Sequence, residues 1–186
     1  MLPPVQPAAV ARQLKPITLG GYLTKRRGSL TTPIDDEHLA AIGRVSVNFA
    51  LLEFQLAEAL RAALGADMSA GRIVIAHLSF RRMLDVLASL ARLRLANDPR
   101  LDDLEDVLSA ASAAEDSRNQ LLHSTWIAGA PHQEVSRFKT TAKRAKGLEI
   151  QAEAVSVDRI NATAEQIAEA TFDMAEVQYW FTRTEP

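Results

Sequence analysis

Apolar side chains recur at steps of three or four residues along most of the chain, the spacing that places them on one face of an α-helix. One run begins after Asp35, a residue type that caps helix N-termini, and ends before Gly65, a residue type that follows helix C-termini. Another starts at Asp98 and Pro99, which favour the beginning of a helix. The pattern predicts an all-α protein, an up-and-down four-helix bundle, with helices at residues 35–64, 69–95, 99–123 and 157–183.

The helical spacing stops between the third and fourth of these helices. Residues 127–156 contain stretches of alternating apolar and polar positions around Lys146-Gly147, which predict a small β-hairpin-like insertion. Before the first helix, residues 1–34 hold five of the eight prolines and three of the eight glycines. We therefore expect an extended N-terminal arm without a core of its own, followed by one helical domain at residues 35–186.

Composition fits a single soluble domain, since 47% of the 186 residues are hydrophobic and 24% are charged. The absence of cysteine excludes disulfides, thiolate metal sites and thiol nucleophiles. We find no uninterrupted apolar run of membrane-spanning length and no signal-peptide pattern at the start, so we expect a cytoplasmic protein without a membrane partner. The net charge of -2 conceals a basic arm on an acidic body, and such an arm can bind polyanions, dock on its own domain or remain solvated.

The densest polar cluster of the helical pattern lies near the end of the third predicted helix. Asn119 and His123 are four residues apart and share a face, and Glu115 lies one turn before Asn119. The long side chain of Arg118 can bring its guanidinium to the same end of the helix. Four different hydrogen-bonding groups would thus converge, an arrangement that is costly to bury without a purpose.

This set suits RNA cleavage through the neighbouring 2′-hydroxyl. A histidine can transfer protons near neutral pH, and an arginine can hold the scissile phosphate and stabilise the charge of the transition state. His123 and Arg118 are the candidates for these two roles, and Asn119 would orient either of them. This chemistry requires neither a metal nor a cofactor. In the alternative interpretation, Asn119 and His123 form an interhelical hydrogen-bond network, and Arg118 pairs with Glu115 or Asp116.

Arg118, the polar Asn119 and then, after three further positions, His123 resemble the motif of the HEPN superfamily. These are small helical domains of toxins, abortive-infection proteins and CRISPR-associated ribonucleases. The resemblance covers about residues 35–183 in architecture and about ten residues in motif; the arm and the insertion are not part of it. It implies a metal-independent endoribonuclease of a toxin or defence system. It also implies a homodimer whose motifs share a cleft, and an antitoxin or defence protein as partner.

Further residues fit an RNA-cleaving site. Glu53 stands among apolar neighbours on the first helix, where it either orients Arg118 or His123 or is simply exposed. The insertion brings five cations within ten residues, which either grip a phosphate backbone or keep a hairpin edge from pairing. These candidates for RNA binding are Arg137, Lys139, Lys143, Arg144 and Lys146.

Two other function classes remain open from the sequence. One is a non-catalytic HEPN-like module that binds RNA, a nucleotide or a protein. The other is a structural helical dimerisation protein, in which the polar cluster is a buried network that supports the fold.

Overall fold

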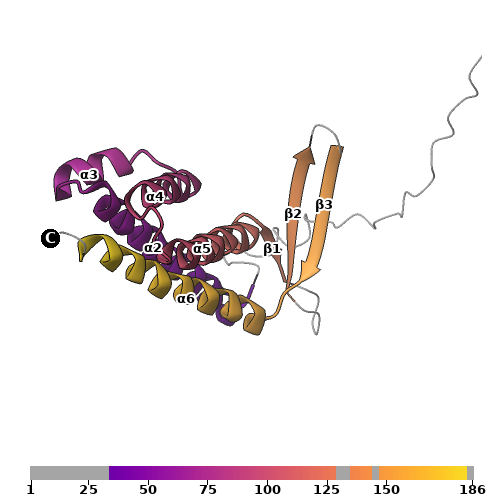
Figure 1. The fold of residues 1–186 in the computed structure, drawn as a ribbon. Helices are drawn as coiled ribbons and strands as arrows, with labels where there is room; N and C mark the ends of the chain where they lie inside the picture. Colours follow the sequence, from indigo (N-terminus) through magenta and orange to yellow (C-terminus); the bar gives the residue numbers. More distant parts are fainter. Residues whose placement is uncertain (1–33, 129–134, 144–146, 184–186) are drawn as a thin grey trace, which may run out of the picture. The chain divides into compact units, whose positions relative to one another are not determined.

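The computed structural model describes residues 34–128, 135–143 and 147–183 (Figure 1). The chain divides into two units, Met1–Thr32 and Pro33–Pro186, and all described residues belong to the second unit. These residues are mostly helical and include a small three-stranded antiparallel sheet, which confirms the predicted helical class. Of the predicted arm, only Ile34 lies within the described residues.

Helix α2 (Asp36–Leu64) follows the prediction closely. The side chain of Asp35 accepts a hydrogen bond from the backbone N–H of His38, which satisfies one of the free donors at the helix start. At the other end Gly65 has a φ of 62°, the left-handed conformation that glycine adopts without steric cost.

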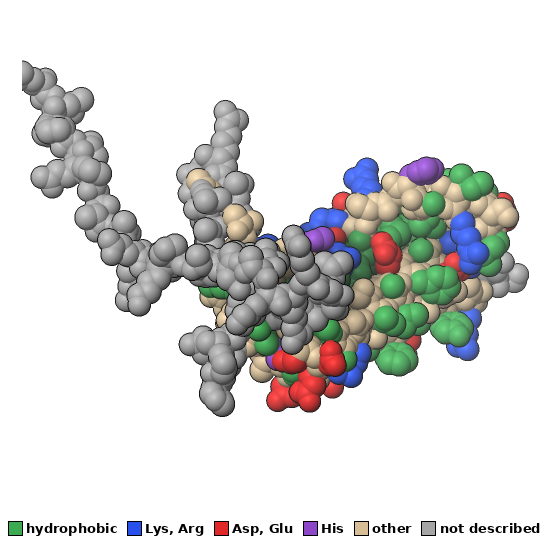
Figure 2. Space-filling model, turned by 180° about the vertical axis from the view of Figure 1, so that it is seen from behind, with side chains coloured by type: hydrophobic (Ala, Val, Ile, Leu, Met, Phe, Trp, Pro, Cys, Tyr) green, Lys and Arg blue, Asp and Glu red, His purple; other side chains and the backbone are tan. Residues whose placement is uncertain are grey.

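Helix α2 carries apolar side chains on more than one face. By length and composition alone this helix is apolar enough to cross a membrane, a property that the core helix of a soluble protein shares. One face of α2 forms the core, whereas Val47, Leu51 and Phe54 are 62%, 53% and 51% exposed on another. Figure 2 shows hydrophobic side chains spread over one face of the helical body.

The second predicted helix is in fact two helices, α3 (Met68–Ile75) and α4 (Phe80–Arg94). The side chain of Ser79 accepts a hydrogen bond from the N–H of Arg82 and so starts α4 as a new helix. Residues 76–79 include neither glycine nor proline, so periodicity alone did not reveal the break. Ile73, which belongs to the apolar spacing of the helix predicted at residues 69–95, is 68% exposed on α3.

This break changes the direction of the chain. At the start of α4, Phe80 packs on Phe49 of α2 with ring centroids 4.9 Å apart. At the end of α4, Arg94 donates to the carbonyl oxygens of Ala62 and Ala63, each at 2.9 Å, near the end of α2. Helix α4 therefore runs parallel to α2, because residues 65–79 lead the chain back along α2.

The remaining helices are α5 (Arg100–Leu122) and α6 (Val157–Thr182). Ion pairs of α4 with α5 join Arg81 to Glu115 and Arg92 to Glu105, so these two helices are antiparallel. Helix α6 runs parallel to α2. Near the start of both helices, His38 bonds the carbonyl oxygen of Val155. Further along both helices, Asn48 of α2 donates to the carbonyl oxygen of Ala164 of α6. The four long helices therefore do not alternate up and down as predicted.

The predicted insertion is a sheet between α5 and α6, in the order β1 (Thr125–Ile127), β2 (Ser136–Lys143) and β3 (Gly147–Ala154). Strands β2 and β3 form the expected hairpin, and the short β1 adds a strand that the pattern did not predict. The register places Arg137 opposite Glu153, a pairing that becomes important at the end of α5.

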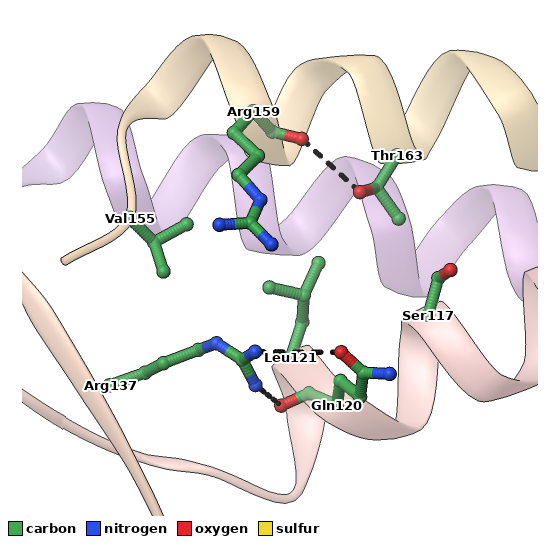
Figure 3. A pocket seen from close by; sticks show the side chains of 7 residues that line it. All are labelled: Ser117, Gln120, Leu121, Arg137, Val155, Arg159 and Thr163. Carbon is green, nitrogen blue, oxygen red and sulfur yellow. Dashed lines mark hydrogen bonds between the residues drawn. The ribbon is translucent and has the colours of Figure 1, made fainter. Parts of the chain in front are cut away.

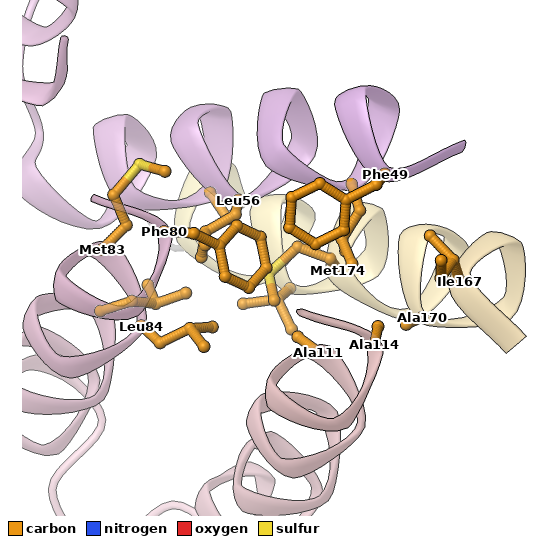
Figure 4. Close-up of a cluster of buried hydrophobic side chains, with 14 of the residues drawn as sticks. Phe49, Leu56, Phe80, Met83, Leu84, Ala111, Ala114, Ile167, Ala170 and Met174 are labelled. Carbon is orange, nitrogen blue, oxygen red and sulfur yellow. The ribbon is translucent and has the colours of Figure 1, made fainter. Parts of the chain in front are cut away.

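The hydrophobic core lies between α2, α4, α5 and α6 (Figure 4). Helix α5 contributes Ala111 and Ala114, which are 0% and 5% exposed. Because alanine side chains end at Cβ, they let the larger Phe49 and Met174 of the neighbouring helices fill the shared space. Close packing at this level fixes the position of the last turns of α5, where the polar cluster lies.

Candidate functional site at the end of helix α5

The structure brings the three motif side chains together. Arg118 Nη1 donates to Asn119 Oδ1 at 2.8 Å and lies 3.4 Å from His123 Nε2. Because an arginine N–H can only donate, Nε2 accepts, which requires the histidine tautomer that carries its proton on Nδ1. One guanidinium nitrogen thus orients both the amide and the imidazole.

An aromatic ring of α2 supports this guanidinium. The Cζ atom of Arg118 lies 5.0 Å from the ring centroid of Phe49, within cation–π range. The Nε of Arg118 is buried and has no hydrogen-bond partner within the described residues. Arg118 is therefore held by stacking and by its own helix.

The imidazole is the accessible member of the cluster. His123 is exposed and is the C-cap residue of α5, where its backbone N–H bonds the carbonyl of Asn119 at 3.3 Å. Arg118 and Asn119 are half-buried. All bonds among the three residues stay within one helix end, unlike the interhelical network of the alternative interpretation.

The two acidic candidates lie elsewhere. Glu115 Oε2 is 3.4 Å from Arg81 Nη2 of α4, an ion-pair contact without hydrogen-bond geometry, and Arg81 also bonds Asp116 at 3.3 Å. Glu53 is exposed on α2, and no hydrogen bond or ion pair joins it to Arg118 or His123. Neither acid therefore supports the motif by direct contact in the described residues.

Arg137, expected to bind RNA, is instead a structural contact, and only 9% of it is exposed. Its Nε and Nη2 donate to Glu153 Oε2 at 3.1 and 2.6 Å. Its Nη1 donates to the carbonyl of Gln120 at 2.8 Å and lies 3.4 Å from Ser124 Oγ, and Nη2 also reaches Gln120 Oε1 at 3.5 Å. All three guanidinium nitrogens are engaged, so Arg137 fastens β2 to the end of α5 and is not offered to a phosphate.

The other four basic candidates are only partly described. Lys139 is half-buried on β2, and Lys143 ends that strand opposite Gly147. The side chain of Lys143 lies outside the described residues, as do Arg144 and Lys146 altogether. RNA contact through these lysines and Arg144 stays a prediction.

The sequence pattern did not single out Glu153 and Arg159, which join Arg137 in a network of ion pairs. Arg159 of α6 bonds Glu153 Oε1, while Arg137 binds the other carboxylate oxygen. The bonds from Arg159 and Arg137 lower the pKa of Glu153 below its ordinary value, against a smaller opposing effect of burial. The partnership of Glu153 with Arg137 depends on the register of the β2–β3 hairpin, which places the two residues opposite each other.

A small pocket of about 70 Å³ adjoins this network, between the end of α5, the sheet and the start of α6 (Figure 3). Among the described residues, no group of three or more histidine, aspartate or glutamate side chains is placed to hold a metal ion. Comparison of the chain with protein-family models, with curated proteins and with solved structures found no match.

Proposed function

We propose that the described helical unit is a HEPN-like domain and that the end of α5 is a metal-independent endoribonuclease site. The observation that carries the proposal is the 3.4 Å contact between Arg118 Nη1 and His123 Nε2 at an exposed helix end. A cation that can bind a phosphate and a group that can transfer a proton meet there, at a position that a polymer can reach. The four long helices α2, α4, α5 and α6 would be the bundle of the family, with α3 as an addition.

In the proposed reaction the guanidinium of Arg118 turns from His123 to the phosphate, and the freed Nε2 of His123 accepts the proton of a ribose 2′-hydroxyl. The 2′-oxygen bonds to the adjacent phosphorus, and the bond from phosphorus to the 5′-oxygen breaks. Arg118 stabilises the negative charge that grows on the phosphoryl oxygens, and Asn119 keeps the guanidinium oriented. The leaving 5′-oxygen takes a proton from a protonated histidine, a role that a second copy of His123 would fill in a homodimer. The products are a 2′,3′-cyclic phosphate and a 5′-hydroxyl.

The biological setting belongs to the same proposal. A ribonuclease of this kind would act in the cytoplasm, as a toxin or a defence protein, with RNA as substrate and an antitoxin or defence protein as its regulator. The support is the motif resemblance together with the exposed position of His123.

One observation favours the non-catalytic alternative. His123 Nδ1 has no hydrogen-bond partner in the described residues, and neither Glu53 nor Glu115 orients the ring from behind. A histidine without such a partner can still bind a phosphate or a nucleotide. The structural alternative is favoured by the exposed apolar side chains of α2, at Val47, Leu51 and Phe54, which a dimer could cover.

The test uses the purified full-length protein and a panel of single-stranded RNAs in the presence of a metal chelator. We expect cleavage that leaves cyclic phosphate ends, and its loss in His123→Ala with an unchanged melting temperature. His77→Ala is the matched control, because His77 is also exposed but belongs to the turn between α3 and α4. Equal cleavage by His123→Ala would overturn the proposal, and RNA affinity without any product would favour the binding module.

A further inference from the structure

The pocket beside the motif has a polar lining drawn from three parts of the fold. It lies on the side of α5 that carries Ser117 and Gln120, and its other polar walls come from β2 and from α6 (Figure 3). The polar side chains that line it are those of Ser117, Gln120, Arg137, Arg159 and Thr163. Ser117 directly precedes Arg118 in the chain, so the pocket and the motif share the last turns of one helix.

The acceptor atoms at this pocket are already engaged. Both carboxylate oxygens of Glu153 accept bonds from arginines, Oε2 from Arg137 and Oε1 from Arg159. The side-chain oxygen of Gln120 faces Arg137 Nη2 at 3.5 Å. The hydroxyl of Thr163 donates its proton to the carbonyl of Arg159 at 3.2 Å, so Thr163 is not a free donor.

The donors, by contrast, are largely free. Arg159 uses Nη1 for Glu153, and within the described residues its Nε and Nη2 have no acceptor; its side chain is 58% exposed. The Ser117 hydroxyl and the Gln120 amide nitrogen likewise have no partner in the described part of the chain. Two arginines against one glutamate leave one net positive charge. A small pocket that offers donors and positive charge, and little free acceptor capacity, is complementary to an oxyanion.

We propose that this pocket binds a phosphate group, held by Arg159 Nε and Nη2, the Ser117 hydroxyl and the Gln120 amide. Arg137 keeps the wall in place and adds charge without giving up its own bonds. This inference rests on the proposed function when it takes the phosphate to be one of the RNA backbone. An RNA strand that crosses the end of α5 would then place one phosphate at Arg118 and another at this pocket. Free inorganic phosphate presents the same chemistry.

The first experiment reads the pocket without any RNA. The full-length protein is titrated with inorganic phosphate at constant ionic strength, and the backbone amide signals of Ser117, Gln120 and Thr163 are followed by NMR. We expect saturable shifts confined to this region and about tenfold weaker binding in Arg159→Gln, because a bond to a charged group is lost. Arg92→Gln is the control, since Arg92 is similarly exposed at 63% and also pairs with a glutamate. Absence of saturable shifts, or equal binding by Arg159→Gln, would overturn the proposal.

The second experiment distinguishes the two sources of phosphate. Binding of a non-cleavable 2′-O-methyl RNA is measured for the wild type, Arg159→Gln and Arg92→Gln. A loss of RNA affinity that is specific to Arg159→Gln supports a backbone phosphate. Unchanged RNA affinity, combined with weakened inorganic phosphate binding, overturns the RNA assignment and leaves a site for a free oxyanion. Failure of the ribonuclease proposal is visible separately, either as wild-type protein that forms no product or as His123→Ala that cleaves as well as the wild type.

Discussion

Arg118 and Arg137 approach the same end of α5 and are used in opposite ways. Arg137 is nearly buried, and all its guanidinium nitrogens bond Glu153, Gln120 or Ser124. Arg118 bonds only side chains of its own helix end, rests on Phe49, and has an Nη2 without a hydrogen-bond partner within the described residues. The saturated arginine holds the sheet on the helix, whereas the unsaturated one retains capacity for a ligand.

The difference has an energetic consequence. Removing one partner of a buried and hydrogen-bonded ion pair leaves the other partner desolvated, which is strongly destabilising. Removing a half-buried arginine whose contacts are a neighbouring amide and a ring costs little more than those local contacts. Stability and activity should therefore separate when the two arginines are substituted.

The largest effect is expected on activity when Arg118 is changed. Arg118→Ala should lower kcat of RNA cleavage by about 100- to 1000-fold, because the donor that stabilises the phosphoryl charge is lost. The free energy of unfolding, measured by urea denaturation, should fall by no more than about 1 kcal/mol. A large loss of stability with little change in kcat per folded molecule would reverse the comparison and favour the structural alternative.

The next largest effect is expected on stability when Arg137 is changed. Arg137→Met should lower the free energy of unfolding by about 2–3 kcal/mol, since Glu153 and the carbonyl of Gln120 lose their donor. Arg92→Met should change it by less than about 0.5 kcal/mol, because both partners of that pair are more than 60% exposed. Equal stability of the two variants in urea denaturation would show that Arg137 does not fasten the sheet.

A smaller effect concerns the ring beneath Arg118. Phe49→Leu should lower kcat about three- to fivefold, because a cation–π contact contributes about 0.5–1 kcal/mol to the position of the guanidinium. It should also lower the unfolding free energy by about 1–2 kcal/mol through lost core packing. Phe80→Leu is the matched control, because it removes the ring contact with Phe49 but retains the Phe49 ring beneath Arg118. If both variants lowered kcat equally, the position of Arg118 would not depend on Phe49.

The sequence predicted those features that depend on local chemistry. The caps at Asp35 and Gly65 and the start of α5 near Asp98 follow from side-chain and backbone preferences, and the structure confirms them. The end of α5 could be predicted as a candidate site because Arg118 and His123 lie within one turn and a half of helix. Their contact needed no knowledge of the rest of the fold.

Features that depend on distant partners escaped prediction. The break at residues 76–79 is set by capping at Ser79 in a stretch whose apolar spacing still looks helical, and it reverses the expected direction of α4. Arg137 looked like a surface cation because its partner Glu153 lies sixteen residues away, across a hairpin. Arg159 had no distinguishing spacing at all, and its place at the pocket depends on its bond to Glu153 of β3.

The smallest predicted effect is on the pH dependence of stability. It tests how Glu153 holds Arg137, the arginine whose hydrogen bonds are all made. Its pKa in the folded protein is lowered from 4.5 by the bonds from Arg159 and Arg137. A depressed folded-state pKa contributes stability that is fully present above the unfolded pKa and is lost as the pH falls through the folded value. Wild type should therefore exceed Glu153→Gln in unfolding free energy at pH 7, and the gap should narrow progressively below about pH 4.5. The gap stays modest because Glu153 is 36% exposed.

Urea denaturation from pH 7 to pH 3 measures this gap. Glu105→Gln is the control, because Glu105 forms an exposed pair with Arg92. A gap that did not change with pH would mean that the Glu153 carboxylate charge does not secure Arg137, and the hold on the sheet would then rest on the carbonyl of Gln120.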